Sequence, residues 1–153
     1  MSNKEKKQQE EKDAFLRFVA KLGQSDEWVA VENRPEPEPD LLCLHTIDGR
    51  RAFELVSLTD ESIAIRLAAG EKANIEPFST ADPSGRIIRA KLNKRYQTSV
   101  FRIDLLVYTD GRIITPDDVI IPTIQPLFDN VPHPFDAVWF MGEFETRCLW
   151  SRL

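Results

Sequence analysis

An acidic residue lies in the middle of an apolar segment, residues 51–58, that is rich in β-forming side chains. This residue, Glu54, stands between Phe53 and Leu55. Burying a charge costs several kcal/mol unless a counter-charge or a metal ion compensates it. Asp40 ends a run of alternating prolines, and thirteen residues separate it from Glu54. The two carboxylates are therefore candidates for one shared site, provided that the fold brings them together.

A β-hairpin is predicted here, with strands at residues 41–47 and 51–58. The Asp48-Gly49 pair between the two strands is a strong signal for a tight turn. The register of the hairpin decides whether Asp40 and Glu54 lie on the same face of the sheet, because neighbouring side chains alternate between faces. A two-residue turn places Asp40 opposite Ser57, on the face away from Glu54.

We favour the alternative register, which has a three-residue loop and a left-handed Gly49. This register pairs Thr46 with Arg50, Leu42 with Glu54 and Asp40 with Val56. Asp40, Glu54 and Val56 then line one face. The opposite face is expected to pack these side chains together: Leu41, Cys43, Ile47, Phe53 and Leu55.

The rest of the chain predicts a single α/β domain. A length of 153 residues with 42% hydrophobic residues is enough for one core and short for two. We expect residues 1–13 to form a charged, disordered or frayed tail and residues 14–153 to form the domain, a central mixed sheet flanked by helices. Further strands are predicted near residues 28–31, 101–108, 135–141 and 146–150. Helices are predicted near residues 15–22, 61–69, 86–96 and from 117, with Pro122 and Pro126 breaking the last one.

The net charge of −5 means that any nucleic-acid site must be a local basic patch. Residues 86–96 offer such a patch, because they contain five cations and no acid: Arg86, Arg89, Lys91, Lys94 and Arg95. As a helix, this segment carries an apolar stripe of Ile88, Leu92 and Tyr96, and Lys91 lies at the border of the stripe. We expect Lys94 to lie farther round, toward solvent.

The spacing of Pro39-Asp40 and Glu54-Leu55-Val56 resembles the PD-(D/E)xK nucleases, the restriction-endonuclease-like superfamily. The resemblance covers most of the chain after about residue 28 and includes the basic helix and the strands that follow it. Its pattern is an Asp, a variable spacer, and Glu-x-Lys on the next strand. This chain departs from that pattern, because Val56 stands where the family has a lysine.

The resemblance implies a restriction-endonuclease-like fold and a Mg²⁺- or Mn²⁺-dependent nuclease that acts on DNA. Asp40, Glu54, the carbonyl of Val56 and Glu32 are then the metal ligands, and Lys91 supplies the missing cation from the neighbouring helix. The resemblance also implies that nucleic acid is contacted by Arg86, Arg89, Lys94 and Arg95.

Other interpretations of the same residues stay open. Glu54 can instead form a structural ion pair with an arginine such as Arg102. The chain can be a nuclease fold that has lost catalysis and serves as a binding or regulatory module, or an interaction subunit that uses the proline-rich loop. We expect a cytoplasmic protein with reduced cysteines, no membrane span and a possible homodimeric state.

Overall fold

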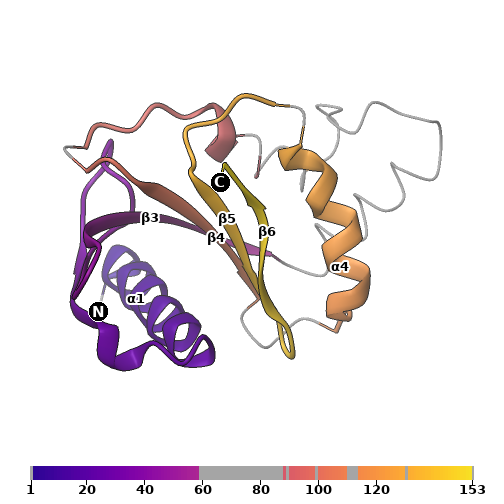
Figure 1. Ribbon diagram of the computed structural model, residues 1–153, viewed down its shortest axis with the longest axis horizontal. Helices are drawn as coiled ribbons and strands as arrows, with labels where there is room; N and C mark the ends of the chain where they lie inside the picture. Colours follow the sequence, from indigo (N-terminus) through magenta and orange to yellow (C-terminus); the bar gives the residue numbers. More distant parts are fainter. Residues whose placement is uncertain are drawn as a thin grey trace.

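The computed structural model describes residues 2–58, 88, 90–98, 100–109, 114–129 and 131–152. In these residues, six strands form one mixed sheet in the order β1-β2-β3-β4-β5-β6. The predicted α/β class, a mixed sheet flanked by helices, is confirmed, with α1 against one face of the sheet and α4 against the other (Figure 1). The predicted helix at residues 61–69 lies outside the described residues.

The two central strands, β3 (Gly49–Leu58) and β4 (Ile103–Thr109), run parallel. On one side, β3 pairs antiparallel with β2 (Leu41–His45), which pairs antiparallel with β1 (Trp28–Asn33). On the other side, β4 pairs parallel with β5 (Ala137–Met141), which forms an antiparallel hairpin with β6 (Thr146–Ser151). Parallel pairing requires both faces of the sheet to be covered, which explains why every residue of β4 is buried.

Helix α1 (Asn3–Lys21) covers one face of the sheet. It begins earlier than the sequence indicated and includes most of the segment that we expected to be a disordered or frayed tail. The Ser2 hydroxyl accepts a hydrogen bond from the Glu5 amide and caps its first turn. Phe15 and Phe18, spaced to lie on one side of the helix, pack against Phe53 of β3.

The other face of the sheet is covered by α4 (Asp117–Ile124), which continues as the 3-10 turn η2 (Gln125–Phe128), and by a helical segment at residues 88 and 90–93. The prediction that Pro122 breaks the helix is wrong, since Pro122 lies inside α4. A proline at this position removes only the hydrogen bond to the carbonyl of residue 118, in the first turn. The change to 3-10 geometry comes later, where Pro126 follows.

The β2–β3 hairpin has neither of the registers considered from the sequence. Leu42 pairs with Ala52 rather than with Glu54, so β2 is displaced by two residues from the expected pairing. The loop consists of residues 46–48, and Gly49, with a φ of 76° as expected for a left-handed residue, begins β3. Since side chains alternate with a period of two, this displacement keeps every side chain on its predicted face.

The packing expected opposite the carboxylates is confirmed except at the hairpin tip. Leu41, Cys43, Phe53 and Leu55 belong to the core beneath α1. Ile47 does not join them, because it lies in the loop and is 84% exposed. Within the described residues, no helix is long and apolar enough to cross a membrane.

Candidate carboxylate site

The structure brings Asp40 and Glu54 together. Asp40 lies one position beyond the last pair of the β2–β3 ladder, level with Glu54. The Asp40 amide donates to Oε1 of Glu54 at 2.9 Å, and the Leu55 amide donates to Oδ2 of Asp40 at 3.0 Å. The two acids therefore bridge the end of β2 and the middle of β3 through backbone contacts, at the point where β3 continues without β2 beside it.

The helical segment at residues 90–93 supplies a cation to this pair, as the sequence predicted. Buried Ile88 and Leu92 anchor the segment in the core on the face where Glu54 lies. Lys91 Nζ then donates to Oε2 of Glu54 at 3.0 Å, and the Glu54 side chain is fully buried. A cation from a neighbouring element thus lies beside the acid whose strand carries Val56 in place of a lysine.

Two further side chains reach the same carboxylate oxygen. The Tyr96 hydroxyl donates to Oε2 of Glu54 at 2.8 Å, and Lys94 Nζ lies 3.5 Å from it. Lys94 also pairs with Glu36 of the proline-rich loop at 2.8 Å. Lys94 therefore does not extend into solvent as expected from the helical pattern, because the helix ends at residue 93 and the chain turns toward the carboxylates.

Burial raises the pKa of both acids above their usual values. For Glu54, the neighbouring Asp40 carboxylate raises the pKa further, and Lys91 opposes the increase. Two carboxylates held close together hold a proton between them more readily than either does alone. Burial and the charge on Glu54 raise the pKa of Tyr96, which keeps its hydroxyl protonated as a donor.

The alternation of backbone groups places the carbonyl of Leu55, rather than that of Val56, near Asp40. In an extended strand, the N–H and C=O of one residue point to the same edge. The Leu55 amide faces Asp40, whereas the Ala52 amide binds the carbonyl of Arg102 on the β4 side. Val56 has the same parity as Ala52, so its carbonyl belongs to the ladder with β4. A metal ion bound by Asp40 would therefore lie near the carbonyl of Leu55 and not near that of Val56, which we expected as a ligand.

Glu32 and Arg102 do not join the carboxylate site. Glu32 is an exposed residue of β1 that pairs with Arg34 at 2.9 Å. Arg102 binds Asp104 on the opposite face of the sheet at 2.9 Å, and not Glu54. The structural ion pair considered for Glu54 thus forms with lysines instead of with this arginine.

The predicted nucleic-acid residues are only partly described. Arg86 and Arg89 lie outside the described residues. Arg95 is exposed next to the site, and Lys94 lies within it. The basic character of the segment is therefore divided, with Lys91 and Lys94 facing the carboxylates and Arg95 facing solvent.

Sequence reasoning missed two residues, Tyr96 and Glu11. Tyr96 had been assigned to the apolar stripe of the basic helix, and a hydroxyl on such a stripe is a signal that a buried acceptor lies nearby. Glu11 is a buried acid of α1 whose charge also raises the pKa of Asp40, after burial itself. In the sequence, the burial of Glu11 could have been inferred from its position, because it lies four residues before Phe15, on the apolar side of the helix.

The oxygen donors fit a hard divalent cation. Mg²⁺ is usually held by one or two carboxylates and keeps several waters, so Asp40 and Glu54 with the Leu55 carbonyl form an adequate set. In the described part of the chain, no group of three or more His, Cys, Asp or Glu side chains is placed to hold a metal ion. A Mg²⁺ or Mn²⁺ ion held by Asp40 and Glu54 would therefore need water to complete its coordination shell.

Comparisons of the chain with models of protein families, with curated proteins and with solved structures found no match.

Proposed function

We propose that the chain is a Mg²⁺- or Mn²⁺-dependent nuclease of the PD-(D/E)xK type, with a restriction-endonuclease-like fold and DNA as its substrate. The observation that carries the proposal is the 3.0 Å contact between Lys91 Nζ and Glu54, with Asp40 level with Glu54 across the hairpin. A buried acid, a partly buried acid beside it and a lysine from another element form the set that phosphodiester cleavage needs.

Each residue has a role in this proposal. Asp40, Glu54 and the Leu55 carbonyl would hold the metal ion, which would offset the negative charge that builds on the phosphate. Lys91 lies within reach of the same carboxylate and can orient a water molecule or neutralise a phosphate oxygen. Tyr96 fixes the Glu54 side chain by donating to Oε2. Glu11 adds negative charge close to Asp40, which favours a cation there.

The test is cleavage of linear DNA in the presence and absence of Mg²⁺. Wild-type protein should cleave only with the metal ion, Asp40→Asn should abolish cleavage, and Lys91→Gln should reduce it by about 100-fold or more, in the range that positioned proton donors provide. Glu143→Gln, which alters an exposed acid in the β5–β6 turn, should cleave like wild type. Equal cleavage by Asp40→Asn and Glu143→Gln would contradict the proposal.

A second function, a binding module without catalysis, is favoured by the hydrogen bonds around Glu54. Its oxygens already accept from the Asp40 amide, Tyr96 and Lys91, so the site is satisfied without a metal. The two functions differ in their response to Mg²⁺. A nuclease should gain thermal stability from Mg²⁺ through Asp40, whereas the module should not.

A further inference from the structure

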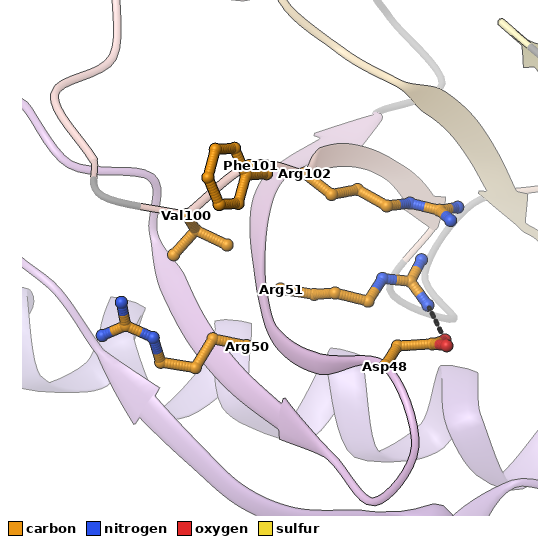
Figure 2. A pocket seen from close by; sticks show the side chains of 6 residues that line it. All are labelled: Asp48, Arg50, Arg51, Val100, Phe101 and Arg102. Carbon is orange, nitrogen blue, oxygen red and sulfur yellow. Dashed lines mark ion pairs between the residues drawn. The ribbon is translucent and has the colours of Figure 1, made fainter.

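Two adjoining pockets lie at the beginning of β3 and beside the segment that enters β4. The larger pocket, of about 290 Å³, is lined by Asp48, Arg50, Arg51, Val100, Phe101 and Arg102 (Figure 2). The smaller pocket, of about 200 Å³, shares Arg50 and Val100 with it and extends to Pro39 and Ala52. We call the two pockets together the arginine groove. The lining of the smaller pocket includes Pro39, which precedes Asp40 in the chain, but neither Asp40 nor Glu54.

The larger pocket is basic in a protein that is acidic overall. Its lining contains three guanidinium groups and one carboxylate, against a net charge of −5 for the whole chain. Figure 2 shows Arg51 and Arg102 side by side and Arg50 pointing the other way, below Val100. The cations therefore point toward two sides of the pocket, and apolar Val100 lies on the side of Arg50.

Buried Asp104 fixes two of these guanidinium groups. It accepts hydrogen bonds from both Arg51 and Arg102, and Asp48 lies 3.8 Å from Arg51. Arg51 is largely buried, yet its Nε has no hydrogen-bond partner among the described residues.

Phe101 gives the pocket an aromatic wall that is open to solvent. Its side chain is fully exposed, although neighbouring Val100 is partly buried against the core. An exposed aromatic ring among arginines matches the surfaces that bind single-stranded nucleic acid, where bases stack on rings and cations follow the phosphates. A volume of about 290 Å³ is at the lower limit for small-ligand sites and suits one nucleotide unit, not a duplex.

We propose that the arginine groove binds single-stranded DNA, with a base stacked on Phe101, phosphates contacted by Arg50 and Arg102, and the strand directed along the groove toward Asp40 and Glu54. The substrate class of the carboxylate site is then a single strand or an unpaired end. This inference rests on the proposed nuclease function only for cleavage, because binding by the groove requires neither metal ion nor catalysis.

The test is fluorescence anisotropy in EDTA with labelled oligothymidylate and with a labelled duplex of equal length. Wild type should bind the single strand more tightly than the duplex. Phe101→Ala should weaken single-strand binding by about 5- to 150-fold, the effect of losing one stacked base. Phe144→Ala removes another exposed ring, from the β5–β6 turn, and serves as the matched control, with no loss expected.

A second variant tests the phosphate contacts. Arg50→Gln should reduce the slope of log affinity against log salt by about one. Equal binding of duplex and single strand, or equal affinities for Phe101→Ala and Phe144→Ala, would overturn the groove. The proposal for the groove would also be overturned if polyglutamate competed as strongly as unlabelled oligothymidylate, since the site would then recognise charge alone.

Mg²⁺-dependent cleavage separates the two proposals. One outcome is metal-dependent cleavage of single strands and duplexes that Phe101→Ala leaves unchanged. This outcome would support the nuclease proposal and overturn the proposal that the groove binds single-stranded DNA. Single-strand binding that depends on Phe101, without cleavage under any metal condition, would support the groove and contradict the nuclease.

Discussion

Two fully buried carboxylates lie on opposite faces of the sheet, and their surroundings differ in kind. Asp104, on the face beneath α1, accepts from Arg51, Arg102 and the indole of Trp139. Glu54, on the face beneath α4, has lysine and tyrosine donors and a second acid beside it. Both satisfy the rule that a buried charge needs partners, yet only one has a carboxylate as its neighbour.

The difference indicates which acid is structural. Two guanidinium groups bind Asp104, and arginine forms rigid, permanently charged pairs. Around Glu54 and Asp40, two carboxylates face Lys91 and Lys94, which balance the charge but can move on flexible side chains. In the proposed nuclease, a divalent cation would enter the second cluster by displacing these flexible lysines from the carboxylates.

The largest effect on stability is expected from Asp104→Asn. Removing this charge takes the nearest counter-charge from the guanidinium of Arg51, which is largely buried. It also removes the ion pair between Arg102 and Asp104. The free energy of unfolding should fall by about 3–5 kcal/mol, as measured by urea denaturation in EDTA. Asp118→Asn, at an exposed position in α4, should change it little. A loss as small as that of the control would remove the distinction between the two clusters.

A smaller loss is expected from Tyr96→Phe. The substitution removes one hydrogen bond to buried Glu54 and leaves Lys91 in place. We expect a loss of about 1.5–3 kcal/mol, the range for hydrogen bonds to charged groups. In a protein that already carries Glu54→Gln, Tyr96→Phe should lower the free energy of unfolding by less. A double-mutant cycle then measures the coupling between Tyr96 and Glu54. Additive effects would show that the hydroxyl does not support Glu54.

The sequence predicted that Asp40 and Glu54 share one face of the sheet, because only the parity of the register mattered for that. The register itself could not be predicted, since Asp48-Gly49 is compatible with several loops and the loop found here is displaced by two residues. Lys91 was predictable from the position of the basic helix relative to its apolar stripe. Tyr96 was not, because its hydrogen bond depends on where the helix ends.

The partners of Asp104 show a second limit. Arg51 and Arg102 are far apart in sequence, and they meet only because β3 and β4 are parallel neighbours. A single sequence does not show which strands are neighbours, so Arg102 was considered a partner for Glu54 and not for Asp104. Side chains two residues apart in an extended segment point to the same face. Arg102, just before β4, therefore lies on the same face as Asp104 and binds it.

The contribution of Asp40 and Glu54 to the free energy of unfolding is expected to depend on pH. The pKa values of Glu54 and Asp40 are raised by burial, so the folded state binds protons more tightly than the unfolded state. Their contribution to stability is therefore fully present below the unfolded pKa values, about 4, and is lost as the pH rises through the folded values. In EDTA, wild type should gain stability between pH 7 and about 4.5 relative to the double variant Asp40→Asn/Glu54→Gln. A parallel dependence in both proteins would contradict the raised pKa values.

The smallest effect on the metal-free protein is expected from Asp40→Asn, and its sign is informative. The substitution removes repulsion with Glu54, while the side-chain oxygen of asparagine can still accept from the Leu55 amide. In EDTA, stability should stay equal or rise by up to about 1 kcal/mol.

With Mg²⁺ at about 100 times its dissociation constant, wild type should gain about 2.7 kcal/mol and Asp40→Asn should gain nothing. Chemical denaturation with and without Mg²⁺ measures both quantities. A loss in EDTA as large as that of Asp104→Asn would make Asp40 a structural residue like Asp104, because a carboxylate kept for binding a cation should be dispensable when the cation is absent.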